Sequence, residues 1–301
     1  MRGNRTGLKK RINKLKRTAA ALSLAAVLCL TGCAPLAPEP PVSSSPAAGN
    51  DLGVMVIDVG QGDSILVAFG SDDVMLIDAG EQKDAAAIKE ELDERGISQI
   101  DVLVATHPHA DHIGGMAEII GSCEIGRVYM PDMRSDSKTY QKLMDTIEKH
   151  GIPITVAYAG ETFHLGDASC TIVSPDKDAD KDANNESVML MVDYLDTEFL
   201  LTGDAEAWAE SEVLSAGYGI DADVLKVGHH GSYTSTSEAF LKAVSPDFAV
   251  ISCGKGNDYG HPHQETLDLL DKYDIDTLRT DVSGDVLFVT DGHTLKTVLG
   301  D

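Results

Sequence analysis

The residues from Thr106 to Gly115 read THPHADHIGG and gather four potential metal ligands directly after an apolar segment. That segment, DVLVA at positions 101–105, is short and rich in β-branched residues, which predicts a buried strand. Gly114 and Gly115 then allow the backbone to turn into a helix. A strand, a ligand-bearing loop and a helix in this order predict an α/β fold, because such folds place their sites at the carboxyl ends of strands.

The four ligand-type residues of this loop are spaced for two cations. Imidazole and carboxylate are ligands that borderline divalent metals prefer. Residues two apart in an extended loop project to the same side, so His107 and His109 can bind one metal. Asp111 and His112 then turn toward a second metal. A solvated polar loop is the alternative, and four ligand-type residues at this spacing argue against it.

Three further groups of ligand-type residues lie downstream. FLLTGDA at 199–205 ends in Asp204, whose carboxylate can bridge two cations or cap the following helix. ADVLKVGHHGS at 222–232 predicts a buried strand followed by His229 and His230, and GHPH occupies 260–263. Seven of the ten histidines lie in these groups and in the THPHADHIGG loop. This bias favours one shared centre.

Strand-like and helix-like segments alternate in two successive halves, which predicts a layered α/β domain over residues 52–301. The expected strands cover 54–60, 64–69, 73–80, 101–105, 127–130, 168–174, 187–194, 199–202, 224–227, 248–252 and 286–290. The expected helices cover 84–95, 137–149, 205–215, 235–243 and 264–273.

The N-terminal region has the pattern of an export signal. The first 17 residues carry eight Lys/Arg, and an apolar run at 19–30 is too short to span a bilayer comfortably. Leu30-Thr31-Gly32-Cys33 resembles a bacterial lipobox, which implies removal of residues 1–32 and lipidation of Cys33. An ordinary signal peptide and an uncleaved anchor are the alternatives. Residues 33–51, rich in Pro, Ser and Ala, predict a disordered tether, and the domain is expected on the extracytoplasmic side of the membrane.

The charge balance argues against broad electrostatic binding of nucleic acids. Without residues 1–32, the chain retains 16 basic and 49 acidic residues and a formal charge of −33. Such a field repels polyanions at long range, whereas nucleic-acid binders usually show the reverse balance. No Lys/Arg cluster occurs outside the signal.

The motifs together resemble those of the metallo-β-lactamase superfamily, and more narrowly the hydrolase domain of the ComEC competence proteins. The matching stretches run in order through nearly all of the mature chain: DVGQGDS (58–64), LIDAG (76–80), THPHADHIGG, NNES (184–187), LLTGDA (200–205), LKVGHHGS (225–232) and GHP (260–262). The resemblance implies a single αββα sandwich with its site at the edges of the sheets.

The resemblance also implies roles for individual residues. The family's metal-binding positions fall on His107, His109, Asp111, His112 and Asp204, and we assign His230 as the distal histidine ligand. In this assignment Asp111 also orients the nucleophile, and His229 contacts the substrate or its transition state. Asn185 and His261 are expected at the rim of the site, while Asp58 and Asp78 are expected to anchor turns and support the ligands.

The chain departs from the pattern in two respects. Many superfamily members carry a further histidine ligand between the first cluster and Asp204, where this chain reads NNES. One of the two expected cations is therefore expected to be held either less tightly or by more oxygen and water ligands, which widens the choice of metal. Zinc is the expected metal, and manganese and iron are alternatives. The membrane-channel part of the competence proteins is absent from this sequence.

These features predict a membrane-anchored, metal-dependent hydrolase that acts on phosphodiester bonds. The expected substrate is DNA or another nucleic acid, as in the competence family. One alternative is a cell-envelope phosphodiester, such as a phosphorylcholine-decorated teichoic acid. The other is a binding lipoprotein that uses metal only for structure. Membrane lipid, through Cys33, and the substrate are the expected partners, and no motif indicates a stable protein partner.

Overall fold

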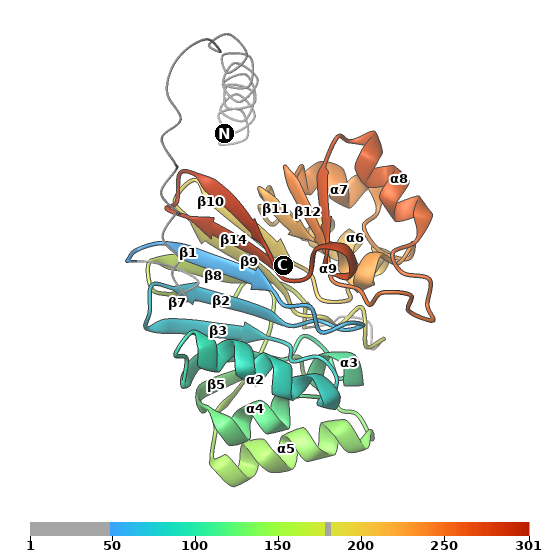
Figure 1. Ribbon diagram of the computed structural model, residues 1–301. Coiled ribbons are helices and arrows are strands. Elements are labelled where there is room, and N and C mark those ends of the chain that lie inside the picture. Colours follow the sequence, from blue (N-terminus) through green and yellow to red (C-terminus); the bar gives the residue numbers. More distant parts are fainter. Residues whose placement is uncertain (1–48, 178–181, 301) are drawn as a thin grey trace, which may run out of the picture. The chain divides into compact units, whose positions relative to one another are not determined.

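The computed structural model describes residues 49–177 and 182–300, which form two sheets packed face to face (Figure 1). The first sheet has the order β15-β14-β1-β2-β3-β4-β5-β6 and the second has the order β13-β12-β11-β10-β9-β8-β7. The strands of the first sheet are β1 (Leu52–Val56), β2 (Ile65–Phe69), β3 (Asp73–Ile77), β4 (Gln99–Val104), β5 (Glu124–Met130), β6 (Ile154–Val156), β14 (Val286–Thr290) and β15 (Leu295–Leu299). Those of the second are β7 (Thr162–Leu165), β8 (Ala168–Ser174), β9 (Met189–Tyr194), β10 (Thr197–Leu201), β11 (Val224–Lys226), β12 (Phe248–Ile251) and β13 (Asp276–Arg279).

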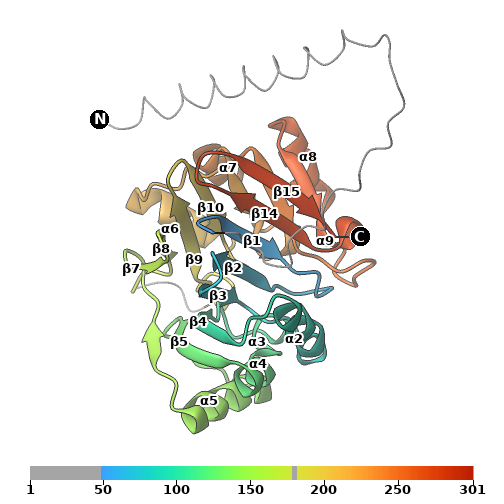
Figure 2. The same ribbon diagram turned by 60° about the vertical axis from the view of Figure 1, so that its left-hand side comes forward.

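Helices cover the outer face of each sheet, as Figures 1 and 2 show. The first sheet is covered by α2 (Ala85–Glu94), α4 (Met116–Ser122) and α5 (Lys138–His150). The second is covered by α6 (Ala207–Ala216), α7 (Glu238–Val244) and α8 (Gln264–Lys272). The short elements η1 (Gln82–Asp84), α3 (Ala110–Ile113), η2 (Gly228–Gly231) and α9 (Thr280–Ser283) lie in connections between strands and helices. The predicted αββα architecture is confirmed.

Alternation along the buried strands explains the layers. In β10, Phe199 and Leu201 point into the core between the sheets, while Leu200 points outward under its helices. In β1, Val54 belongs to the central core and Met55 to the outer core beneath α2 and α4. Because both faces of these strands are covered, they read as continuous apolar runs rather than as alternating patterns.

The connectivity places several strand ends at one edge. Strands β3, β4, β5 and β6 are mutually parallel, and so are β10, β11, β12 and β13. Each half therefore presents the carboxyl ends of parallel strands, the position where α/β folds build their sites. Among the described residues, no helix is both long and apolar enough to cross a membrane. The predicted signal, most of the predicted tether and Cys33 lie outside the described residues.

Sequence patterns missed several edge elements. The strands β6, β7, β13 and β15 lie at or near the edges of the sheets and are only partly buried. Without burial on both faces, they carry no apolar run to reveal them. The predicted strands at 54–60 and 73–80 are longer than β1 and β3, because their last residues leave the sheet and enter the site loops.

Candidate metal centre

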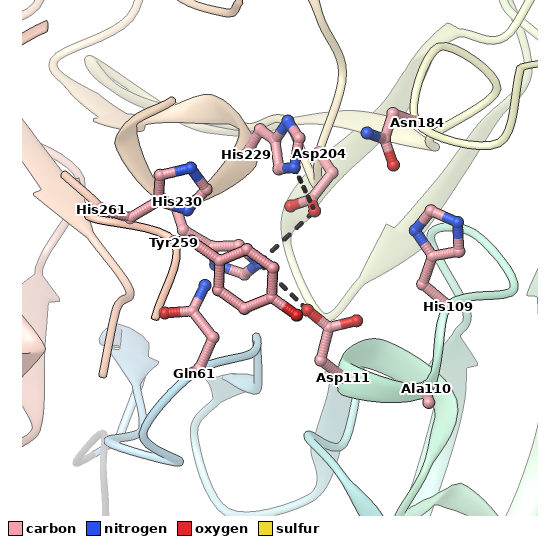
Figure 3. Close-up of a pocket in the computed structure, with 10 residues that line it drawn as sticks. All are labelled: Gln61, His109, Ala110, Asp111, Asn184, Asp204, His229, His230, Tyr259 and His261. Atoms are coloured by element: carbon pink, nitrogen blue, oxygen red, sulfur yellow. Dashed lines mark ion pairs between the residues drawn. The ribbon is translucent and has the colours of Figure 1, made fainter. Parts of the chain in front are cut away.

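The ligand-type residues converge at the carboxyl ends of β4, β10 and β11, as Figure 3 shows for most of them. His107 and His109 follow β4, and Asp111 and His112 lie on α3. Asp204 follows β10, whereas His229 and His230 follow β11 and lie on η2. Segments about 120 residues apart in the chain therefore meet because the parallel strands of two sheets end at the same edge.

The backbone around the tandem histidines is strained. His229 and His230 adopt left-handed conformations with φ of 47° and 54°, which are costly for residues other than glycine. Gly228 and Gly231 bracket them, and a Cβ on Gly231 would lie 2.6 Å from Pro262 Cβ. The tight turn directs both imidazoles toward Asp204. Such strain persists only where the surrounding structure enforces it, and it is common in functional sites.

A single carboxylate oxygen organises the centre. Asp204 Oδ2 lies 3.2 Å from Nε2 of His112 and 3.4 Å from Nε2 of His230. The same oxygen lies 3.8 Å from Nε2 of His229 and 3.9 Å from Nε2 of His107. Four imidazole nitrogens thus surround one buried carboxylate oxygen.

Acceptors behind the imidazoles fix which nitrogen faces Asp204. His112 Nδ1 donates to Asp78 Oδ2 (2.7 Å), and His230 Nδ1 donates to the Ser252 carbonyl (3.0 Å). With Nδ1 carrying the proton, each Nε2 lone pair is available to a cation, which is the usual arrangement behind metal-binding histidines.

The donor set fits a divalent metal. One oxygen or nitrogen from each of Asp111, His112, Asp204 and His230 lies within 4.8 Å of every other. Asp204 Oδ1, His112 Nε2 and His230 Nε2 are buried and have no hydrogen-bond partner of acceptable geometry among the described residues. Orphaned buried polar atoms are costly, and a bound cation would satisfy all three. These four residues would hold one metal, and His230 rather than His229 belongs to this group.

His107 and His109 supply a second set of donors. His107 Nε2 lies 3.9 Å from Asp204 Oδ2 and 3.0 Å from His109 Nδ1. Ser187, in the NNES stretch, lies beside His107: its Oγ lies 3.4 Å from His107 Nδ1 and accepts a hydrogen bond from the Asp204 amide (3.2 Å). This half of the centre therefore has two imidazole donors, as the first has, but no carboxylate of its own besides the shared Asp204.

His229 is held by a carboxylate that the sequence reading did not identify. Its Nδ1 donates to Glu206 Oε1 (3.0 Å), and the same oxygen accepts hydrogen bonds from Thr234 Oγ1 (2.9 Å) and Asn184 Nδ2 (3.3 Å). His229 lines the pocket, and its Nε2 lies 3.8 Å from Asp204 Oδ2. Glu206 lies two residues after Asp204, and the GDAE sequence is the only local signal for it.

The rim residues differ in part from the expectation. His261 lines the pocket, as expected, together with Gln61, Asn184 and Tyr259. Asn185 does not line it: its Oδ1 accepts a hydrogen bond from the Ala209 amide and its Nδ2 donates to Asp182 Oδ2. Asn185 holds the start of α6, and its neighbour Asn184 takes the place at the rim.

A buried ion pair lies beneath the ligands. Lys226 is fully buried, and its Nζ lies 2.5 Å from Asp63 Oδ2 and donates to the Gly203 carbonyl (3.1 Å). Asp63 Oδ1 lies 3.4 Å from His230 Nδ1. Burial alone would raise the pKa of Asp63, but Lys226 and the nearby imidazoles outweigh it and lower the pKa to about 2. Both residues belong to quoted motifs, DVGQGDS and LKVGHHGS, but their pairing is visible only in three dimensions.

The two acidic residues expected to support turns do so. Asp78 accepts hydrogen bonds from the amide and hydroxyl of Thr106 (2.8 and 2.6 Å) and so fixes the start of the ligand loop. Asp58 Oδ1 accepts from the Gly60 amide (3.0 Å) in the loop after β1.

Comparison with known proteins agrees with this geometry. The model of the metallo-beta-lactamase superfamily matches residues 57–255. The chain belongs to the metallo-beta-lactamase superfamily. Solved structures share the fold: the metallo-beta-lactamase fold protein YhfI from Bacillus subtilis has a TM-score of 0.52 at 10% identity, covering 82% of this chain and 100% of that one. The metallo hydrolase Igni18 from Ignicoccus hospitalis has a TM-score of 0.50 at 15% identity, covering 78% and 98%.

Curated relatives include competence proteins. ComE operon protein 3 of Bacillus subtilis is 34% identical over 81% of this chain and 34% of its own length. Competence protein ComA of Neisseria gonorrhoeae is 31% identical over 87% of this chain and 35% of its own length. The chain therefore spans about a third of the length of these relatives.

The charged side chains at the centre of this metallo-beta-lactamase domain shift one another's pKa values, so that metal binding is linked to the release of protons. Burial disfavours the imidazolium of His112, but Asp204 and Asp78 raise its pKa well above the ordinary value, and Asp204 does the same to the pKa of His230. Burial opposes the charge on Asp204 as well, yet these imidazoles lower its pKa well below its usual range. In the metal-free protein, the direction of these shifts favours the protonated imidazoles of His112 and His230.

We expect metal affinity to rise with pH. A cation must displace the protons on His112 and His230, so each displaced proton changes the apparent affinity by about tenfold per pH unit below the raised pKa values. Calorimetric titration of metal-free protein with Zn²⁺ or Mn²⁺ between pH 6 and 8, in buffers of different ionisation enthalpy, counts the protons released. A pH-independent affinity without proton release would contradict this expectation.

Proposed function

We propose that this domain is a dinuclear metal-dependent hydrolase of phosphodiester bonds, with nucleic acid as its first candidate substrate. One observation carries the proposal: Asp204 Oδ2 faces Nε2 of four histidines, within 3.2–3.9 Å. The carboxylate lies between the Asp111–His112–His230 donors and the His107–His109 donors. It is therefore positioned to bridge two cations, whereas structural zinc sites are usually closed and single.

Two cations would supply a water of lowered pKa and would stabilise charge on the attacking and leaving oxygens of a phosphodiester. The residues of this chain supply the rest. Asp111, three-tenths exposed at its side chain, extends from the ligands toward the pocket and is placed to orient the nucleophile. His229, oriented by Glu206, is placed to donate a hydrogen bond from Nε2 to a phosphoryl oxygen when its ring is protonated.

The nucleic-acid assignment is supported by the names of the curated relatives, which include ComE operon protein 3, Recombination protein 2 of Haemophilus influenzae and Competence protein ComA. The pocket over the centre has a volume of about 370 Å³, within the usual range of small-molecule sites.

A second candidate substrate is a phosphorylcholine-bearing envelope polymer. The formal charge of −33 after residue 32 disfavours a polyanion, and the lipobox supports a position at the cell envelope. We also propose that Cys33 anchors the domain to the outer face of the membrane; labelled palmitate would then be incorporated by the native chain and not by Cys33→Ser.

The function is tested with bis-p-nitrophenyl phosphate. We expect turnover by the metal-loaded protein, its loss after chelation and its return on adding Zn²⁺ or Mn²⁺. His109→Ala removes a ligand and should be inactive, whereas His164→Ala, an exposed histidine on β7, should match the native protein. If metal-loaded native protein cleaves neither this ester, nor oligonucleotides, nor phosphorylcholine esters, the phosphodiesterase proposal fails. Release of choline phosphate without oligonucleotide cleavage would select the second substrate.

A further inference from the structure

An exposed aromatic ring stands at the mouth of the pocket, and the metal centre does not account for it. Tyr259 lines the pocket with 68% of its surface exposed, and Figure 3 shows its ring across the front of the site. Its ring stacks on His261, with centroids 5.7 Å apart and an interplanar angle of 21°. Single exposed aromatic side chains are ordinary at a protein surface, and this one is set apart by its place beside the candidate active site.

The loop that carries Tyr259 is rigidly built. Asn257 Oδ1 accepts hydrogen bonds from the amides of Tyr259 (3.1 Å) and His261 (3.0 Å), and its Nδ2 donates to the carbonyls of Gly254 (2.8 Å) and His261 (2.6 Å). The Gly254 amide donates to Gln61 Oε1 (3.2 Å), which ties the loop to the segment after β1. The backbone that carries the ring is therefore fixed at the pocket mouth before any ligand arrives, which reduces the entropy lost on binding.

We infer that Tyr259, backed by His261, is a stacking platform for the nucleobase of a nucleotide whose phosphate lies at the metal centre. The inference rests on the proposed phosphodiesterase function and specifies its substrate. Base–aromatic stacking tolerates any base, because every base has a π-face. A single rigid ring beside a phosphate site is sufficient for one unstacked base.

The residues that line the pocket favour a short single-stranded nucleic-acid end over a long nucleic acid and over a choline-bearing polymer. None of its lining residues, given above, is Lys or Arg, so the pocket offers no side-chain cation to a long phosphate backbone. Binding energy must then come from the metals and from stacking. A choline headgroup is usually recognised by a cage of several aromatic faces. Tyr259 is the one tyrosine, phenylalanine or tryptophan among the lining residues.

The experiment compares two diesters with the same leaving group, thymidine 5′-(p-nitrophenyl phosphate) and methyl p-nitrophenyl phosphate. We expect the native protein to prefer the thymidine ester in kcat/KM, mainly through a lower KM. Tyr259→Leu should lose about 5- to 150-fold of this preference, the range that corresponds to one stacked base. Tyr259→Phe should keep it, because Phe preserves the ring and removes only the hydroxyl.

The matched control is Tyr233→Leu. Tyr233 is equally exposed, at 66%, and packs against His263, but it does not line the pocket. It should leave the preference unchanged. The platform is overturned if Tyr259→Leu keeps the full preference, if Tyr259→Phe loses as much as Tyr259→Leu, or if the native protein shows no preference for the thymidine ester.

A binding measurement separates this inference from the proposed function. Fluorescence anisotropy of labelled tetrathymidylate with the metal-loaded protein reports the platform even if neither ester is cleaved. Binding that weakens in Tyr259→Leu and persists in Tyr259→Phe and Tyr233→Leu supports the platform while the absence of turnover rejects the phosphodiesterase. Binding that is equal in all four proteins rejects the platform whatever the activity.

Discussion

Asp204→Asn is expected to lose about 1,000-fold or more of the phosphodiester turnover and to purify with fewer than two equivalents of metal. A metal centre contributes several kcal/mol of transition-state stabilisation, and each 1.36 kcal/mol corresponds to about tenfold in rate. Asp204 is the residue whose Oδ2 faces all four histidine nitrogens, so its loss affects both halves of the centre at once. The amide keeps the size of the side chain but is a much poorer metal ligand.

Metal content by mass spectrometry and initial rates on bis-p-nitrophenyl phosphate measure this effect. Asp145→Asn, an exposed position on α5, is the control and should retain both metal and activity. Circular dichroism of the metal-loaded proteins checks that the fold survives. Two equivalents of metal together with native turnover in Asp204→Asn would rule out a bridging role for this carboxylate.

Lys226→Met is expected to lower the free energy of unfolding by about 3–5 kcal/mol, the cost of leaving one partner of a buried ion pair uncompensated. Lys226 is fully buried, and its ammonium neutralises Asp63 directly beneath His230. The double variant Lys226→Met with Asp63→Asn removes both charges and should recover much of the loss. For a domain of this size, the loss of stability expected for Lys226→Met alone corresponds to a decrease in melting temperature of about 10 °C.

Urea denaturation of metal-free proteins measures these differences without a contribution from metal binding. Lys242→Met is the matched control, because Lys242 pairs with Glu238 on the surface, with 56% of its side chain exposed, and surface pairs contribute about 0–1 kcal/mol. Equal decreases in the free energy of unfolding of Lys226→Met and Lys242→Met would show that the buried ion pair contributes no more to stability than the surface pair. The lowered pKa of Asp63 also makes the free energy of unfolding depend on pH. The stabilisation from the ionised carboxylate is complete above the pKa of Asp63 in the unfolded chain and is lost as the pH falls toward 2.

Much of the fold was predictable because the central strands are buried on both faces. Runs such as FLLT and ADVLKV have the continuous apolar character that marks such strands, and β10 and β11 lie where these runs predict them. The edge strand β15 was missed, since none of its five residues is buried: three are exposed, among them Val298 and Leu299, and two are partly buried. The return of β14 to the first sheet, beside β1, has no local signal at all.

The residues of the site divide in the same way. His107, His109, Asp111 and His112 were recognisable because their ligand chemistry is concentrated in six positions. Glu206, Asp63 and Lys226 were not assigned, because each acts through a partner that is distant in the sequence. Glu206 contacts His229, and Asp63 pairs with Lys226. Asn185 was placed at the rim because it lies in NNES, where many superfamily members carry a further histidine, yet the start of α6 uses its amide and leaves Asn184 at the pocket.

The amino-acid sequence by itself determined which side chains can bind metal and that each follows a strand, because ligand chemistry and strand periodicity are local properties. Only the tertiary structure shows that His230, assigned as a ligand from the resemblance, lies beside Asp111 and His112, and that Asp204 stands between the two sets of donors. The reason is geometric. Convergence depends on the pairing of strands from two sheets and on left-handed backbone angles at adjacent histidines, and neither is encoded within a short window of sequence.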